Sequence, residues 1–155
     1  MIGKRGVMAL LAAAAVLGTP GCTARTDRAA HPPQTADPTA QSPTETLNPL
    51  IEQALPNVPG KTFTSAVVDF PPDAHASPHR HGNAFIYAYV LEGTVRSQVD
   101  DAPVTEYHQG QNWVEQPGAH HVLTENTSQT EHARLLVVFV SNTGDKLKVD
   151  DPQSK

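Results

Sequence analysis

The feature that most constrains the fold is a series of short apolar segments between residues 61 and 140. They are rich in β-branched and aromatic side chains, which favour strands. Turn-forming pairs such as Pro71-Pro72 and Gly82-Asn83 separate them, and no segment keeps a helical period. Short segments at this spacing predict an all-β sandwich or barrel. The predicted strands cover residues 61–70, 85–91, 94–99, 104–107, 113–115, 121–125 and 135–140.

Residues 1–22 are predicted to be an export signal. Lys4 and Arg5 precede a twelve-residue apolar run, which is shorter than the ~20 residues that a transmembrane helix needs. Cys22 follows this run and resembles the lipobox of bacterial lipoproteins, in which the cysteine is lipidated, although Thr19 stands where that family has Leu. The alternatives are a plain secretory signal and an uncleaved N-terminal anchor. We expect an exported protein of the periplasm or cell envelope, anchored by lipid if Cys22 is modified.

Residues 23–59 are predicted to be a disordered spacer, because eight of the 14 Pro residues lie at or before Pro59 and few large apolar residues accompany them. Within it, the spacing of the apolar residues from Leu47 to Leu55 is compatible with one short helical turn. A folded domain is expected over residues 60–143, followed by a polar C-terminal tail at 144–155.

The composition excludes several classes of function. A single Cys rules out a disulfide framework within the chain. The net charge of -5 and the aromatic content of 5% argue against a nucleic-acid partner, which would need a basic face or stacking side chains. A folded part of this size favours a closed barrel, which leaves few sheet edges, and a homodimer is an option.

The sharpest local motif is His79-Arg80-His81. Residues two apart in a strand point to the same face, so both imidazoles can converge on one metal ion while Arg80 faces away. The alternative is an exposed loop that carries two histidines by chance. A second motif contains His120 and His121. Neighbouring strand residues point to opposite faces, so only one of this pair can join His79 and His81.

Together these motifs resemble those of the cupin superfamily, and the resemblance extends from about residue 62 to residue 140. The family's first motif is a His-x-His pair, a Glu, and a Gly that closes the motif. Here His79, His81 and Gly93 match, and Gly93 ends a Tyr-Val-Leu-Glu-Gly stretch. The second motif is matched by Gly110, Gly118 and His121. The resemblance implies an all-β double-stranded β-helix, or jelly-roll barrel, of the small single-domain cupin type.

Three positions depart from the family pattern. Ile86 stands at the position of the usual metal-binding Glu, and no carboxylate lies between His81 and Leu91. Gln116 replaces the Pro of the second motif, and Glu125 replaces its closing Asn, with Asn126 next to it. The change at Ile86 alters the chemistry, because a site with only histidine ligands leaves the full charge of the ion uncompensated.

The resemblance implies that His79, His81 and His121 bind a divalent transition metal. Fe, Zn, Ni, Mn and Cu are not distinguished, because imidazole suits several of these ions. Some cupin dioxygenases are similar in using three His without a Glu, so one expectation is an Fe-dependent dioxygenase, or an isomerase, that acts on a small organic molecule. The alternatives are an envelope module that holds a metal or a small ligand without turnover, and a metal-free structural cupin, against which the spacing of the three His argues.

The remaining candidates concern the fourth ligand and the pocket. His75 is the candidate fourth ligand, although an exposed loop position is the preferred interpretation. Glu115 is expected to bind loop backbone rather than a metal, and His108 and His132 are expected at the surface. If Ile86 faces the metal, the residues of the same parity line a small apolar pocket, which would consist of Ile86, Ala88 and Val90.

Overall fold

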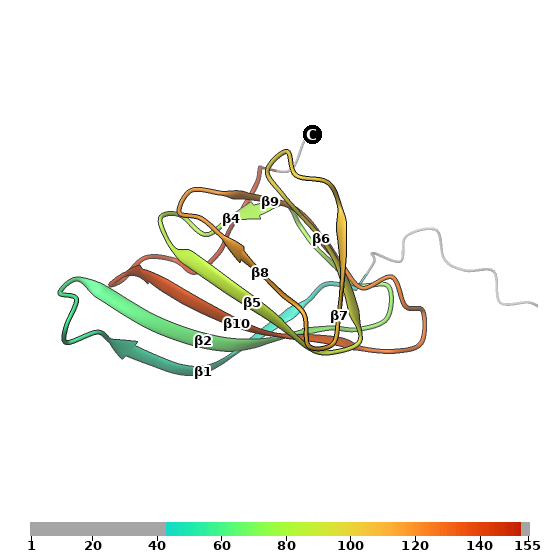
Figure 1. The fold of residues 1–155 in the computed structure, drawn as a ribbon, viewed down its shortest axis with the longest axis horizontal. Helices are drawn as coiled ribbons and strands as arrows, with labels where there is room; N and C mark the ends of the chain where they lie inside the picture. The colour runs from blue at the N-terminus through green and yellow to red at the C-terminus, as the bar shows by residue number, and fades with distance from the viewer. Residues whose placement is uncertain (1–42, 153–155) are drawn as a thin grey trace, which may run out of the picture. The chain divides into compact units, whose positions relative to one another are not determined.

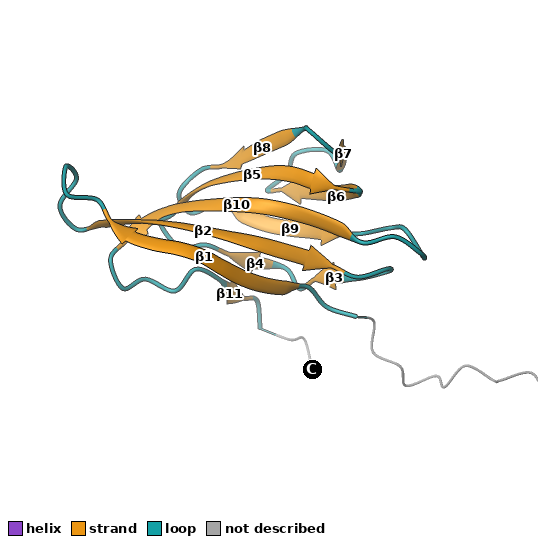
Figure 2. Ribbon diagram, turned by 90° about the horizontal axis from the view of Figure 1, so that it is seen from below, coloured by secondary structure: helices purple, strands orange, loops and turns teal. Residues whose placement is uncertain are grey.

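The computed structural model describes residues 43–152, and these residues form two antiparallel β-sheets that pack face to face (Figures 1 and 2). One sheet has the strand order β1-β2-β10-β5-β8, and the other has the order β11-β4-β9-β6-β7, with β3 also paired to β9. The strands are β1 (Thr46–Ala54), β2 (Lys61–Phe70), β3 (His75–Ala76), β4 (His79–Arg80), β5 (Phe85–Glu92), β6 (Thr94–Val99), β7 (Thr105–His108), β8 (Asn112–Glu115), β9 (His120–Glu125), β10 (Ala133–Asn142) and β11 (Val149–Asp150).

The first sheet supplies most of the apolar core. Burial alternates along β2, β5 and β10, as expected for strands with one face against a second sheet. Their inward side chains are mostly apolar, and Phe70, Ile86 and Phe139 are each at most 2% exposed, whereas Thr62, Thr64 and Ser141 are buried polar residues near the strand ends. The all-β sandwich or barrel predicted from the segment pattern is therefore confirmed, as is the jelly roll that the resemblance implied.

The second sheet has a more polar inner face. Val95 of β6 is fully buried, but Ser97 of the same strand and Thr124 of β9 are buried as well. His79 on β4 and His121 on β9 also point inward. Polar side chains inside a barrel need partners, so this sheet is where a site is expected.

Gly93 connects the two sheets at a tight turn. It lies between β5 and β6 and has a φ of +71°, a conformation that residues with a Cβ rarely adopt. A Cβ built at Gly93 would lie 2.6 Å from the backbone oxygen of His132. The glycine that closes the Tyr-Val-Leu-Glu-Gly stretch is thus required both by backbone conformation and by a neighbouring chain segment.

Two expectations about the ends of the domain differ from the structure. The helical turn expected from Leu47 to Leu55 is instead strand β1, which pairs antiparallel with β2 over its whole length. The folded part thus begins inside the predicted spacer 23–59. The segment expected to be a polar tail, 144–155, contains β11, which pairs with β4.

The N-terminal expectations lie outside the described residues. These include the signal over residues 1–22, Cys22 and the greater part of the spacer. Within residues 43–152, no helix is long and apolar enough to cross a membrane.

Candidate metal centre

Three buried histidines lie together on the inner face of the second sheet. His79 on β4 is the direct register partner of His121 on β9, and His81 lies two residues after His79, directly past the end of β4. The nitrogen atoms that these three side chains offer all lie within 4.8 Å of one another. The ring centroids are 4.8 Å apart for His79 and His81 and 5.0 Å apart for His79 and His121. The three residues singled out in the sequence are thus brought to one place.

Backbone carbonyl groups hold the rings of His79 and His81. The Nδ1 atom of His79 lies 2.7 Å from the carbonyl oxygen of Ser77, and Nδ1 of His81 is bonded to the carbonyl oxygen of Leu147. A carbonyl oxygen can only accept, so each Nδ1 carries the proton and donates it. Each Nε2 then keeps its lone pair, which is the arrangement of a metal-binding histidine whose other nitrogen is anchored.

Burial keeps these two rings neutral. Desolvation is the main cause that lowers the pKa of His79 to about 4, and the neighbouring His121 and His81 add to it. Burial also lowers the pKa of His81, although Glu115 and the bond to Leu147 oppose the shift. A neutral imidazole is the form that binds a metal ion, so the environment favours the binding form near neutral pH.

His121 is held from both sides by side chains. Its Nδ1 lies 3.1 Å from Oε1 of Glu115, and its Nε2 lies 2.8 Å from Oγ of Ser97 and 2.6 Å from Oγ1 of Thr124. The carboxylate accepts from Nδ1, and the hydroxyl groups can donate to Nε2. Trp113 extends this network, because its Nε1–H donates to the same Oε1 of Glu115 at 3.2 Å.

Glu115 is the main residue that the sequence interpretation placed wrongly. It does not bind loop backbone but is 3% exposed and points into the histidine cluster. Its Oε2 lies 3.7 Å from Nε2 of His81 and has no hydrogen-bond partner among the described residues. Burial raises the pKa of Glu115, but the hydrogen bond and charge of His121 outweigh this and hold it below its usual range. The sequence held a signal that Glu115 points inward. Trp113 lies two positions before it, and side chains two apart share a strand face, so a buried Trp113 places Glu115 on the inner face as well.

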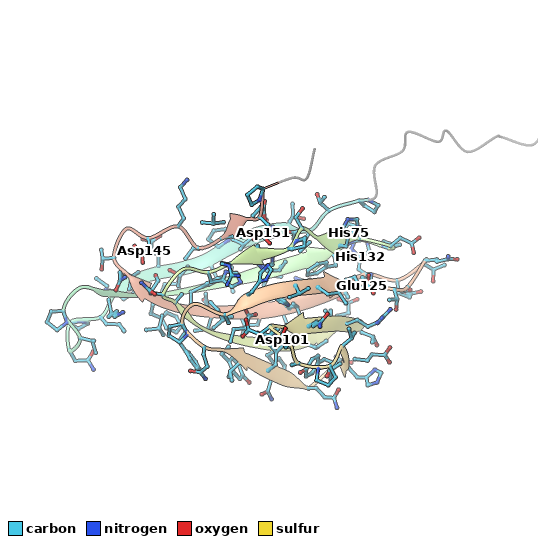
Figure 3. All side chains as sticks on the ribbon, turned by 90° about the horizontal axis from the view of Figure 1, so that it is seen from above. His75, Asp101, Glu125, His132, Asp145 and Asp151 are labelled. Atoms are coloured by element: carbon cyan, nitrogen blue, oxygen red, sulfur yellow. The ribbon has the colours of Figure 1, made fainter. Side chains whose placement is uncertain are left out.

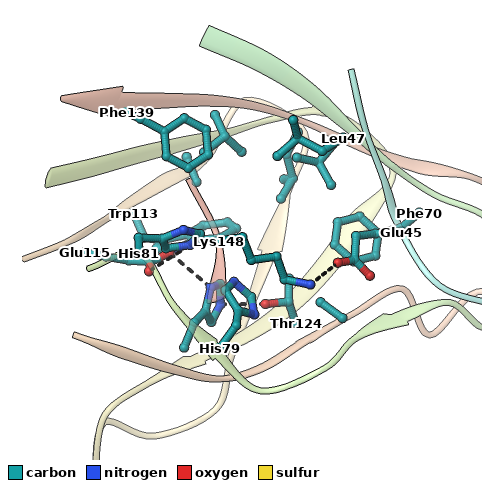
Figure 4. A pocket seen from close by; sticks show the side chains of 16 residues that line it. Glu45, Leu47, Phe70, His79, His81, Trp113, Glu115, Thr124, Phe139 and Lys148 are labelled. Atoms are coloured by element: carbon teal, nitrogen blue, oxygen red, sulfur yellow. Dashed lines mark hydrogen bonds and ion pairs between the residues drawn. The ribbon is translucent and has the colours of Figure 1, made fainter. Parts of the chain in front are cut away.

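The histidines form one end of a narrow cavity of about 60 Å³ (Figure 4). This volume is enough to hold ordered water. The first sheet provides most of the apolar walls, and Ala88 is among them, as predicted. Ile86 and Val90 are buried on the same face of β5 but are not among the lining residues. The other lining residues from the two central strands are Val68, Phe70, Leu135, Val137 and Phe139.

An ion pair from the two ends of the domain also lines this cavity. Nζ of Lys148 lies 2.5 Å from Oε1 of Glu45 and 2.8 Å from Oδ1 of Asp150. Burial lowers the pKa of Lys148, but the hydrogen bonds to Asp150 and Glu45 outweigh this and raise it. Lys148 and Glu45 line the cavity together with the histidines (Figure 4). Neither residue was singled out in the sequence, because each lies outside the recognisable motifs.

The other histidines within residues 43–152 stay apart from this cluster. His75, the candidate fourth ligand, is exposed on β3, and His132 is exposed in the loop before β10 (Figure 3). His120 turns away from its neighbour, and its Nε2 lies 2.8 Å from Oδ2 of Asp151. One member of the His120-His121 pair thus faces inward and the other outward, as the strand geometry predicts. His108 is exposed at the end of β7.

Comparison with known proteins gives one family and many similar structures. Residues 66–139 match the family model of the cupin domain. No curated protein sequence matches the chain significantly. The cupin domain of Schizosaccharomyces pombe Cnp3 is 17% identical, with a TM-score of 0.55, over 68% of this chain and 67% of that one. A cupin domain from Bordetella pertussis Tohama I is 14% identical, with a TM-score of 0.51, over 65% of this chain and 97% of that one.

An oxalate oxidase in complex with the substrate analogue glycolate is also similar in fold. It is 21% identical, with a TM-score of 0.53, and the match covers 73% of this chain and 59% of that one. At these identities the solved structures support the fold and nothing finer.

Proposed function

Residues 66–139 form a cupin domain, and we propose that it binds one divalent transition metal ion through His79, His81 and His121. The observation that carries the proposal is the anchoring of two of these rings by backbone carbonyls, which leaves Nε2 of His79 and of His81 free to bind. His121 would join them when its Nε2 exchanges the hydroxyl groups of Ser97 and Thr124 for the ion. Imidazole donors suit Fe, Zn, Ni or Cu better than they suit Mg or Ca, which prefer oxygen, and Mn accepts mixed nitrogen and oxygen sets.

The residues around the cluster support this donor set. The unpartnered Oε2 of Glu115 is a buried acceptor that a bound cation would satisfy. When bound, an ion of this class supplies Lewis acidity and open positions for a small ligand. The protein's own part is to hold the rings, to exclude water with the apolar walls and to limit what can enter.

The ligand proposed for this cavity is a small molecule with an apolar body. Phe70, Leu135 and Phe139 are among its walls, and the free volume is small. The nearest cationic side chain, Lys148, is already paired with two carboxylates. This disfavours a small dianion such as the substrate of the oxalate oxidase that shares the fold. A larger molecule in this cavity would meet the Lys148–Glu45 pair, which lines it.

The catalytic form of this proposal is an Fe-dependent dioxygenase of such a small organic molecule. The non-catalytic alternative is an envelope module that holds the metal or the ligand without turnover, and the small volume of the cavity is compatible with it. Oxygen uptake by the iron-loaded protein with thiols, diketones and phenols separates the two. We also propose export, on the basis of residues 1–22 alone.

Metal analysis tests the site itself. The purified chain should contain about one divalent transition metal ion per molecule, and His79→Ala and His121→Ala should lose it while staying folded. The matched control is His75→Ala, because His75 is an exposed histidine a few residues before the cluster, and this variant should keep the metal. Full metal content in His79→Ala or His121→Ala would refute the site.

A further inference from the structure

We propose that Glu115 is a fourth, anionic metal ligand, which β8 supplies in place of the carboxylate that is absent at Ile86 on β5. This inference rests on the proposed three-histidine site. It adds a residue from a different strand and changes the charge of the site. Three neutral imidazoles leave a divalent ion with its full charge, whereas one added carboxylate reduces the net charge of the centre to +1.

The position of the carboxylate carries the first step. Oε1 of Glu115 lies 3.1 Å from Nδ1 of His121, and Oε2 lies 3.7 Å from Nε2 of His81. The carboxylate thus lies against two of the three histidines, where it could add an oxygen donor to their nitrogen atoms. Glu115 also lines the same cavity as the histidines (Figure 4).

The second step is that the two carboxylate oxygens of Glu115 differ in their hydrogen-bond partners. Oε1 is occupied, because Trp113 donates to it and His121 lies against it. Oε2 is buried and has no partner among the described residues. A buried charged acceptor without a partner is strongly unfavourable. Lys148 cannot relieve it without leaving Glu45 and Asp150, so a cation between Oε2 and the free Nε2 atoms is the natural partner.

The third step is the register of the sheet. Ile86 and Glu115 are direct antiparallel partners on β5 and β8, and both side chains point inward. Side chains at such positions have Cβ atoms ~4.5–5.5 Å apart on the same face. A carboxylate on either strand therefore reaches nearly the same space. The carboxylate that is missing from the first motif on β5 is thus supplied by Glu115 on the neighbouring strand β8.

A positioning role is the alternative for Glu115. It would then only hold the Nδ1 proton of His121 and orient that ring, without touching the ion. The neutral variant Glu115→Gln separates the two roles, because the Gln side chain keeps an oxygen that can accept from His121 but loses the negative charge. Loss of even an outer carboxylate weakens metal affinity ~10- to 100-fold, so affinity alone cannot separate them and a spectrum is needed.

The experiment is a titration of the metal-free chain with Co²⁺, followed by visible absorption and calorimetry. Glu115→Gln should weaken Co²⁺ binding at least about 100-fold and should change the absorption of the bound ion, because one ligand has changed. The double variant Ile86→Glu/Glu115→Ile moves the carboxylate across the register pair, and it should bring affinity back to within about tenfold of the original chain. Glu106→Gln, at an exposed position, is the matched control and should change nothing.

The outcomes separate this inference from the proposed function. If the original chain binds no Co²⁺, or if His79→Ala still binds it, the three-histidine site fails. If that site holds but Glu115→Gln binds Co²⁺ with unchanged affinity or with an unchanged spectrum, only the role of Glu115 as a ligand is overturned. Thermal melts verify the fold of each variant. Where the double variant does not fold, the spectrum of Glu115→Gln decides.

Discussion

The stability of the metal-free protein should fall steeply between pH 6.5 and pH 4, and His79 should be a main cause. Its side chain is buried, and burial lowers its pKa from 6.5 to about 4. The groups that face it are Lys148, His81 and His121, which oppose a proton, and the Ser77 carbonyl, which favours one. Because burial prevails, and Lys148 and the two other histidines act in the same direction, the folded state binds a proton at His79 less readily than the unfolded chain does.

The direction and size follow from this difference. Between pH 6.5 and pH 4 the unfolded state binds more protons at this position than the folded state, so the free energy of unfolding falls as the pH falls. The contribution of His79 is fully present above pH 6.5 and is lost as the pH approaches 4. A shift from 6.5 to about 4 corresponds to about 3 kcal/mol. His81 acts in the same direction, because its pKa is lowered too.

Urea denaturation of the chelator-treated protein at a series of pH values measures this slope. His79→Asn removes the titrating ring but keeps a donor for the Ser77 carbonyl, so it should reduce the loss of stability between pH 7 and pH 4 by about 3 kcal/mol. His108→Gln, at an exposed site on β7, should keep the slope of the original chain. The reasoning is refuted if His79→Asn and the original chain lose stability equally over this range.

Two further predictions concern the parts of the fold that support the site. Gly93→Ala should destabilise the protein by at least about 2 kcal/mol in urea denaturation, because it adds a clash with the His132 oxygen at 2.6 Å to the backbone cost of ~1–2 kcal/mol. Gly118→Ala, which has positive φ but nothing within 4 Å of its Cβ, should show the backbone cost alone, and an equal effect would exclude the clash. Removing residues 144–155 deletes β11 and the carbonyl that anchors His81, and Co²⁺ titration should show affinity lowered ~10- to 100-fold. Unchanged affinity would mean that this segment does not hold the ring.

The central strands and the His79–His81 pair could be predicted because their signals are local, whereas His121 was assigned to the same site through the resemblance to the second cupin motif. Alternation of inward and outward residues marks β2, β5 and β10, and the spacing of His79 and His81 places both rings on one face. Neither inference requires knowledge of which strand pairs with which. The turn at Gly93 is local in the same way, since positive φ is a property of one residue.

Strand β1 could not be predicted, because its local signal favours the wrong structure. The apolar residues from Leu47 to Leu55 fit a helical spacing, but Leu50 and Ile51 are exposed. The segment is extended because β2 offers a free sheet edge to which it can pair. The pairing shifts register between Pro49 and Ile51, and Pro is tolerated on an edge strand, where its missing N–H costs no ladder bond. Pairing with a distant partner outweighed local propensity here.

The role of Glu115 also could not be predicted from a local pattern, and it matters more because it concerns the residues of the proposed metal site. A search along the chain between His81 and Leu91 finds no carboxylate, which is correct and yet misleading. Strands β5 and β8 are neighbours in one sheet, although β6 and β7, which lie between them in sequence, belong to the other sheet. The pairing of Ile86 with Glu115 therefore depends on the closed topology and not on any local pattern. Because the ligands of a barrel converge from several strands, a substitution at one position can be compensated at its register partner. The donor set is then a property of the sheet register, and a missing motif residue is not by itself evidence of a lost ligand.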